Sequence, residues 1–340
     1  MTIDLNIIWF CLVGILFTGY AILDGFDLGI GALHLFTKAD QERRIMINTI
    51  GPVWDGNEVW LVTGGGVLFA AFPEAYATVF SGFYLAFMLL LCSLIFRAVA
   101  IEFRSKMPMA WWRNMWDVSF SAGSILSAFL FGITVGNLVR GIPLDIHHEF
   151  SGTFWELINP YAIAVGITTV ALFMMHGAIY GIMKTEGSIQ NKLLSWVNNT
   201  ILFFIISYIT ITMATLLFIP HFTEHIRNNP WLFIIVFANM LAIANIPREI
   251  NSKRYWRAFL SSSAAITALL ALFGLGLFPH LVYSNPFPEH SLTIYNAASS
   301  TKTLKIMLIM VGIGMPLVLG YTVSIYWIFR GKVQIDENSY

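Results

Sequence analysis

Long apolar stretches are the feature that most constrains the fold of this chain. A helix needs roughly 20 apolar residues to cross about 30 Å of bilayer hydrocarbon. Eight stretches reach that length, at residues 6–28, 77–97, 118–139, 161–182, 200–220, 230–247, 258–280 and 304–328. Only 11% of the residues are charged, whereas soluble domains carry about 25%. The sequence therefore predicts an all-α polytopic membrane protein with eight transmembrane helices.

Short connections between the predicted spans favour antiparallel neighbours, and so two four-helix bundles. We expect the first bundle, with most of the intramembrane charge, within residues 1–140 and the second within 141–340. A further apolar run near 52–73 is interrupted by Asp55, Glu58 and three consecutive glycines. Irregular backbone at membrane depth must be covered by protein. The run therefore predicts a short buried or re-entrant helix.

Lysine and arginine are unevenly divided between the predicted loops. With the N-terminus inside, the inner loops carry twelve of them and the outer loops seven. Cytoplasmic loops are enriched in these residues, so both termini are expected to face the cytoplasm. The net charge of zero gives no electrostatic reason to expect a nucleic-acid partner. The two cysteines, Cys11 and Cys92, lie in apolar runs and offer no disulfide framework.

Two aspartates near the end of the first span are candidate functional residues. Asp24 and Asp27 are three residues apart and so share one face of a helix. One interpretation places them at the membrane interface. The other places a carboxylate inside the bundle, paired with an arginine such as Arg97, because ionisable groups within a membrane are rare and usually functional. Gly25 and Gly29 have the spacing that lets another helix approach closely.

The stretch GPVWDGNEVWLVTGGG at 51–66 carries the second pair of acids. Its spacing fits a D-x-x-E capping arrangement, with Asp55 as the N-cap and Glu58 as the third helical residue. Trp54 and Trp60 fit interface anchors. A capping role does not exclude a second one, because a partly buried carboxylate can also pass protons.

Histidine limits the haem chemistry open to this chain. Of its eight histidines, only His176 lies well inside a predicted span, and a bis-histidine haem in a helical bundle needs two at matching depth. We interpret His176 as a hydrogen-bonded core residue, with haem ligation as the alternative. The sequence contains no HExxH, P-loop, GxSxG or GxGxxG motif. No catalytic or metal site is therefore predicted in this chain.

Five stretches together resemble subunit II of cytochrome bd-type quinol oxidases. They are DGFDLG at 24–29, ERRIMINTIGPVWDGNEVWLVTGGGVLFAAFP at 42–73, FSGFYLAF at 80–87, FRSK at 103–106 and RNMWD at 113–117. The resemblance implies a bacterial inner-membrane enzyme that oxidises ubiquinol or menaquinol and reduces dioxygen to water, which builds a proton-motive force. This chain would be one subunit of a quinol:oxygen oxidoreductase of the translocase class, without a complete active site of its own.

The resemblance also implies how the cofactors are divided. Subunit I holds the quinol site, two haems b and haem d. Subunit II packs beside it in the bilayer as a haem-free scaffold, with room for a quinone as a structural lipid. A small accessory subunit is a further expected partner.

The family roles carry over to the matching residues. Asp55 of the WDGN block would contribute to a proton path across the subunit boundary, and Trp54 and Asn57 would shape that path. Acids at family positions would either conduct protons or form ion pairs, with Arg97 as a partner; they are Asp24, Asp27 and Glu58.

Two other classes fit parts of the sequence. A proton-coupled secondary transporter would also use buried acids, but it would place a substrate site near the midplane between broken helices in both halves. A membrane cytochrome would bind haem through His176.

Overall fold

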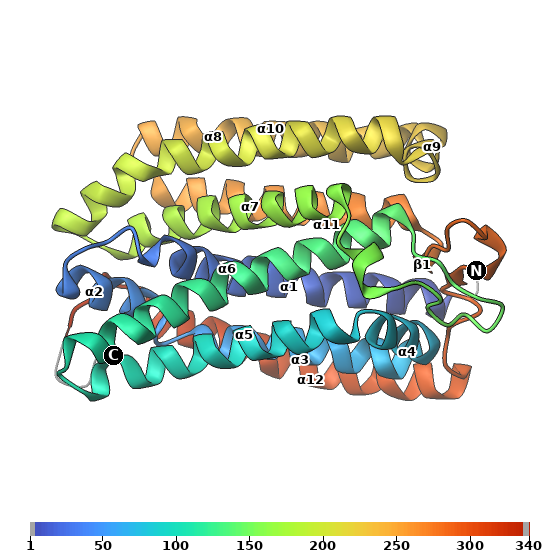
Figure 1. Cartoon of the computed structure of the whole chain (residues 1–340), viewed down its shortest axis with the longest axis horizontal. Helices are drawn as coiled ribbons and strands as arrows, with labels where there is room; N and C mark the ends of the chain where they lie inside the picture. Colours follow the sequence, from blue (N-terminus) through green and yellow to red (C-terminus); the bar gives the residue numbers. More distant parts are fainter. Residues whose placement is uncertain (1–3, 336–339) are drawn as a thin grey trace.

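The computed structural model describes residues 4–335 and residue 340, apart from the side chains of residues 225 and 226. This part of the chain forms a bundle of long helices lying side by side (Figure 1). Eight of its helices are long and apolar enough to cross a membrane, which confirms the predicted class. They are α1 (Leu5–His34), α5 (Tyr84–Phe103), α6 (Ala110–Arg140), α7 (Pro160–Lys184), α8 (Gly187–Phe218), α10 (Phe233–Asn251), α11 (Tyr255–Leu277) and α12 (Thr301–Ile328).

Shorter elements connect these spans. The α-helices among them are α2 (Asp40–Ile50), α3 (Trp54–Ala71), α4 (Pro73–Gly82) and α9 (Pro220–Asn228). Single turns of 3-10 helix lie at Arg104–Lys106, Phe154–Leu157, Pro230–Leu232 and Pro288–His290. Two short antiparallel strands, β1 (His280–Val282) and β2 (Leu292–Thr293), close one end of the bundle.

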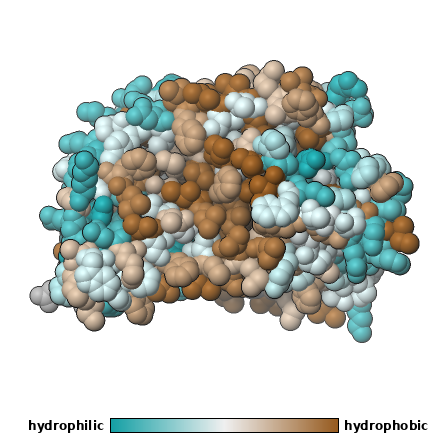
Figure 2. Space-filling model, viewed as in Figure 1, coloured by the Kyte–Doolittle hydropathy of each residue, from teal (hydrophilic) through white to brown (hydrophobic). Residues whose placement is uncertain are grey.

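An apolar belt surrounds the middle of the molecule. On the face drawn in Figure 2, hydrophobic side chains gather across the centre and hydrophilic ones at both ends. The belt includes α12, of which only Leu304 is buried. Exposed apolar area of this extent is unusual for a soluble monomer. It fits a surface that faces lipid or another membrane protein.

Helix α3 runs the length of the bundle, antiparallel to α1. Near its start, Asn57 donates a hydrogen bond to the carbonyl oxygen of Leu23 on α1. At its other end, the carbonyl oxygen of Ala71 accepts a hydrogen bond from Ser299, just before α12. The additional helix expected near 52–73 is therefore present. It crosses the bundle as one continuous helix and does not turn back.

The described ends of the chain lie at opposite ends of the bundle (Figure 1). Close to the start of α1, Trp9 donates to the carbonyl oxygen of Leu304. Tyr340 lies at the other end, where Arg44 and Asn48 of α2 donate to its carbonyl oxygen. This arrangement does not fit the expectation that both termini share one face, because α3 adds a ninth crossing of the bundle; the side of the membrane on which each end lies stays a prediction. We call the two ends of the bundle the α4 end and the α2 end.

Helices α1 and α7 are in backbone contact at the centre of the bundle. A Cβ atom added at Gly29 would lie 1.9 Å from the carbonyl oxygen of Phe173. A Cβ atom added at Gly177 would lie 2.5 Å from the carbonyl carbon of Gly29. The close helix approach expected from the glycine spacing in α1 is confirmed. It buries the α1 face that carries the two aspartates.

Helices from both expected halves share a core. Helix α7 packs on α1 and α6, and α12 packs on α1 and α3. The division into bundles at 1–140 and 141–340 stays a prediction, because this packing crosses the proposed boundary.

Candidate functional site

Arg97 of α5 is the centre of a buried ion cluster. Its Nη2 donates to Asp24 Oδ1 at 2.6 Å and its Nη1 to Asp24 Oδ2 at 3.1 Å. Nη1 also donates to Glu58 Oε1 of α3 at 2.8 Å. Arg97 and Asp24 are both 0% exposed. The interpretation that pairs Asp24 with Arg97 inside the bundle is confirmed, and the interfacial one is wrong. A two-pronged arginine–carboxylate pair also fixes geometry more strongly than a single contact does.

Asp27 belongs to the same cluster but has weaker partners. Its Oδ2 accepts a hydrogen bond from Asn57 Nδ2 at 2.8 Å, whereas Arg97 Nη2 lies 3.8 Å away. Its Oδ1 is buried and has no partner among the described residues. On the other side of the amide, the Tyr326 hydroxyl donates to Asn57 Oδ1 at 2.9 Å. Sequence reasoning missed Tyr326, because it lies in an apolar run 269 positions away from Asn57.

Charge counting separates the roles of these acids. Three carboxylates surround one guanidinium, so full ionisation would leave two uncompensated negative charges in the membrane. An unpaired buried charge is strongly destabilising. Asp24 and Glu58 make the short hydrogen bonds to the guanidinium, whereas Asp27 lies 3.8 Å from it. Asp27 is therefore the most weakly compensated acid of the cluster.

Asp55 lies outside this cluster, at the α2 end of α3. It is exposed and lies in the first turn of the helix. The N-cap is Val53, which has no capping side chain, and the carboxylate of Glu58 bonds Arg97. The D-x-x-E capping interpretation is therefore wrong. Asp55 and Glu58 are three residues apart, so they share one helical face. Together they lead from the exposed end of the bundle, at Asp55, to the buried cluster that Glu58 joins. Trp54, which is half-buried, is next to Asp55 in the chain.

Tyr340 lies close to Trp54 and Asp55. Sequence reasoning missed it. Asn48 clamps its backbone by accepting from its N–H at 3.0 Å and donating to its carbonyl oxygen at 2.8 Å. A Cβ atom added at Gly51 would lie 2.6 Å from the Tyr340 ring, so the ring fits only against glycine. Burial and the nearby Glu102 carboxylate raise the pKa of the Tyr340 phenol.

A second buried ion cluster surrounds Asp117 of α6. Its Oδ2 accepts from Arg43 at 2.9 Å, and its Oδ1 lies 2.5 Å from both Arg104 Nε and His34 Nε2. Arg104 is 1% exposed, so its guanidinium is buried against this carboxylate. The Asp117 side chain is 1% exposed and therefore points into the bundle. Cations compensate this carboxylate on several sides, and we interpret it as a structural tie between α1, α2, α6 and the 3-10 turn that follows α5.

His176 is hydrogen-bonded through both ring nitrogens. Nδ1 lies 2.7 Å from Ser262 Oγ, and Nε2 lies 3.0 Å from the carbonyl oxygen of Ile22. The ring also stacks on Phe259. This geometry confirms the core-histidine interpretation, since neither nitrogen is available to a haem iron. Within the described residues, no three His, Cys, Asp or Glu side chains are grouped to hold a metal ion.

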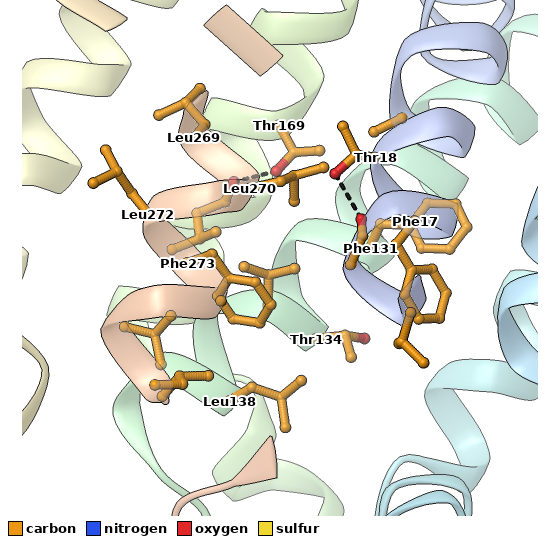
Figure 3. Close-up of a pocket in the computed structure, with 18 of the residues that line it drawn as sticks. Phe17, Thr18, Phe131, Thr134, Leu138, Thr169, Leu269, Leu270, Leu272 and Phe273 are labelled. Carbon is orange, nitrogen blue, oxygen red and sulfur yellow. Dashed lines mark hydrogen bonds between the residues drawn. The ribbon is translucent and has the colours of Figure 1, made fainter. Parts of the chain in front are cut away.

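A large apolar cavity lies between the helices, and Figure 3 shows some of the residues that line it. Its volume is about 1880 Å³, and its walls include α1, α6, α7 and α11. The hydroxyl of Thr18 donates to the carbonyl oxygen of Gly14, and that of Thr169 to the carbonyl oxygen of Val165. These hydroxyls are therefore satisfied within their own helices. The cavity suits an apolar ligand.

Known bacterial proteins resemble this chain over nearly its whole length. Residues 5–329 match the family "Cytochrome bd terminal oxidase subunit II". The chain is 33% identical to cytochrome bd-I ubiquinol oxidase subunit 2 of Escherichia coli K12, over 98% of this chain and 96% of the relative. It is 34% identical to cytochrome bd ubiquinol oxidase subunit 2 of Bacillus subtilis 168, over 98% of each.

A solved structure shares the fold. The bd oxidase from Geobacillus thermodenitrificans aligns with a TM-score of 0.78 at 17% identity, over 96% of this chain and 98% of that one. The eight apolar helices and the bacterial relatives identify a multi-pass bacterial membrane protein. The chain therefore belongs to the subunit II family of cytochrome bd terminal oxidases.

Proposed function

We propose that this chain is the haem-free subunit II of a bd-type quinol oxidase and contributes part of a proton path to its partner. Family membership makes it a component of a haem-containing oxidoreductase complex with a subunit I. In this proposal subunit I holds two haems b and haem d, oxidises quinol and reduces dioxygen. The complex acts as a translocase because those reactions take up and release protons on opposite sides of the membrane. A small accessory subunit would complete it.

One observation carries the proposal, namely the incompletely compensated acid cluster around Arg97. A purely structural ion cluster would balance its charges, as the Asp117 cluster nearly does. In this one Asp27 has only a longer contact of 3.8 Å to Arg97 and keeps a buried oxygen without a partner among the described residues. Protons would enter at Asp55, pass Glu58 and reach the Asp24–Asp27 pair.

The neighbours of the acids shape this path. Trp54 lies half-buried beside its entrance. Asn57 holds the inner acid through a hydrogen bond to Asp27, and Arg97 holds Asp24 and Glu58 in register.

The distribution of basic residues supports a membrane orientation for this path. Fourteen lysines and arginines lie at the α2 end: Lys38, Arg43, Arg44, Arg104, Lys106, Arg113, Lys184, Lys192, Arg248, Lys253, Arg254, Arg257, Arg330 and Lys332. Four lie at the α4 end: Arg140, Arg227, Lys302 and Lys305. The α2 end would face the cytoplasm. Asp55 would then open to the cytoplasm, the N-terminus would lie outside and Tyr340 inside.

The apolar cavity supports a quinone as a structural lipid. Its volume of about 1880 Å³ and its aliphatic and aromatic walls fit an isoprenoid tail. In the proposal the bound quinone stabilises the packing of α1, α6, α7 and α11. Quinol oxidation takes place in the partner.

Two alternatives receive less support. A secondary transporter would need a substrate site shared by both halves, but the carboxylates of the Arg97 cluster come from α1 and α3, both in the first half. A membrane cytochrome would need a free ring nitrogen on His176, and both are engaged.

Asp55→Asn in the assembled complex tests the proposal. The change removes a titratable proton site and nearly keeps the side-chain shape. The haem absorbance of the complex should stay normal, whereas quinol oxidase turnover should fall at least about tenfold, as expected for a lost proton-transfer group. Glu74→Gln is the matched control, because Glu74 is an exposed acid in the first turn of α4 at the other end. Normal turnover of the Asp55 variant would refute the path.

A further inference from the structure

Tyr326 brings the hydroxyl of a largely lipid-facing helix into the acid cluster. Its neighbours along α12 are mostly exposed, such as Tyr321 and Trp327. Its own hydroxyl donates to Asn57 Oδ1 at 2.9 Å. The hydrogen bond therefore connects α12 to an amide that is 2% exposed and touches Asp27.

Hydrogen bonds between the end of α7 and residues 329–332 fix the end of α12 next to this contact. Lys184 at the end of α7 donates to the carbonyl oxygens of Phe329 and Gly331. In return, Lys332 donates to the carbonyl oxygen of Thr185 at 2.9 Å. These bonds begin three residues after Tyr326. They hold the last turn of α12 against the bundle, so the position of the hydroxyl is well determined.

The Asn57 amide has one orientation that satisfies all its partners. Nδ2 donates to the carbonyl oxygen of Leu23 and to Asp27 Oδ2, at 3.1 and 2.8 Å. The carbonyl oxygen can only accept, so it requires the nitrogen on that side. Tyr326 supplies the donor that Oδ1 needs on the other side. A buried carbonyl oxygen without a donor is destabilised by its lost hydration, so the hydroxyl holds the amide in this orientation.

This orientation distinguishes the two oxygens of Asp27. Oδ2 faces a permanent N–H donor, and a proton on that oxygen would point at another hydrogen. Oδ1 has no partner among the described residues and is the oxygen left for a proton. We infer that Tyr326 is a positioning residue which, through Asn57, fixes Oδ1 as the oxygen of Asp27 that exchanges protons. The inference rests on the proposed proton path.

Loss of the hydroxyl would allow a second arrangement. In Tyr326→Phe, Asn57 Oδ1 has no donor, and only the carbonyl oxygen of Leu23 still opposes rotation of the amide toward a protonated Asp27. The acid would then donate from Oδ2 to Asn57 Oδ1. The proton would be trapped in this hydrogen bond and would leave Asp27 more slowly.

Infrared difference spectroscopy and turnover of the assembled oxidase test this inference. The C=O stretch of protonated Asp27 is identified as the band that Asp27→Asn removes. Tyr326→Phe should shift this band, change the pH profile of turnover and slow turnover about 2- to 10-fold, the range expected for one hydrogen bond. Tyr321→Phe is the matched control on the same helix, since its ring is 63% exposed. Turnover is normalised to haem content, so incomplete assembly does not enter the comparison.

The outcomes separate the inference from the proposed function. If Asp27→Asn slows turnover but Tyr326→Phe leaves the band and the pH profile unchanged, the positioning role is refuted and the path stands. If Asp27→Asn and Asp55→Asn both leave turnover and its pH profile unchanged, the path and the inference fall together. A shifted band in Tyr326→Phe with an unchanged one in Tyr321→Phe supports the inference.

Discussion

Arg97→Met should strongly destabilise the folded subunit. Arg97 makes two hydrogen bonds to Asp24, at 2.6 and 3.1 Å, and one to Glu58, at 2.8 Å. Methionine keeps most of the packing volume but removes all three bonds and the positive charge. Asp24, which is 0% exposed, would be left without compensation. Breaking a buried ion pair from one side typically costs about 3–5 kcal/mol.

A second substitution separates the two contributions to the lost stability: the uncompensated carboxylate and the lost packing of Arg97. Adding Asp24→Asn to the Arg97 variant removes the carboxylate that Arg97 pairs most closely. Two acids remain: Asp27, which keeps its hydrogen bond from Asn57, and Glu58, whose side chain is 25% exposed and can reach water. The double variant should recover about half or more of the lost free energy. The coupling between the two positions should therefore be about 2 kcal/mol, within the range seen for residues in direct contact.

Equilibrium unfolding of the purified complex in mixed micelles measures these values. Circular dichroism follows the helical signal as denaturing detergent increases, and haem absorbance reports assembly. Arg113→Met is the matched control, because Arg113 is 34% exposed and pairs with the half-exposed Asp40; it should cost under about 1 kcal/mol. A loss below about 1 kcal/mol at Arg97, or a double variant no more stable than the single one, would refute the reasoning.

Three further predictions follow from particular contacts. Gly29→Ala should push α1 and α7 apart and cost about 1–3 kcal/mol, whereas Gly66→Ala, with open space at its Cβ, should be neutral or stabilising in the same unfolding assay. Glu42 accepts from Lys192 at 2.6 Å, and this bond lowers its pKa. Its stabilisation is therefore present above the unfolded glutamate pKa of about 4.3 and lost as pH falls through the lower folded value. Melting temperatures of wild type and Glu42→Gln should converge at acid pH. His176→Ala should leave the haem spectrum of the complex unchanged, and loss of a haem band would reinstate the cytochrome alternative.

The features that sequence could predict are those that the membrane dictates. Hydrocarbon thickness requires a continuous apolar run for each span, so the eight most apolar helices were recognisable. A buried charge needs a counter-charge, and this requirement pointed from Asp24 to Arg97 before any contact was known. The glycine spacing in α1 predicted a close helix neighbour for the same reason, since a membrane interior rewards close packing.

The features that sequence missed depend on contacts between distant segments. The crossing of α3 was not recognised because its acids and glycines lower its hydropathy, and its position depends on packing against α1. That one helix reversed the side on which the chain ends. Tyr326 and Tyr340 gave no local signal, since their partners lie 269 and 292 positions away. A tyrosine at the end of an apolar span is usually an interface anchor.

The composition of α3 also bears on where protons would go. Its titratable side chains, Asp55 and Glu58, stand in its first two turns at the α2 end, and residues 59–72 hold none. The Asp24–Asp27 pair lies at the same depth, because Asn57 contacts both Leu23 and Asp27. Beyond it, α3 is apolar and glycine-rich up to the α4 end. Protons that entered from the cytoplasm would find no titratable group along α3 to carry them across the membrane. Such a crossing would dissipate the proton-motive force, and the composition of α3 disfavours it. In the proposed function, the exposed face of α3 would be their exit toward the partner subunit. The short polar segment of α3 would then admit protons, and its apolar remainder would keep them from crossing the membrane.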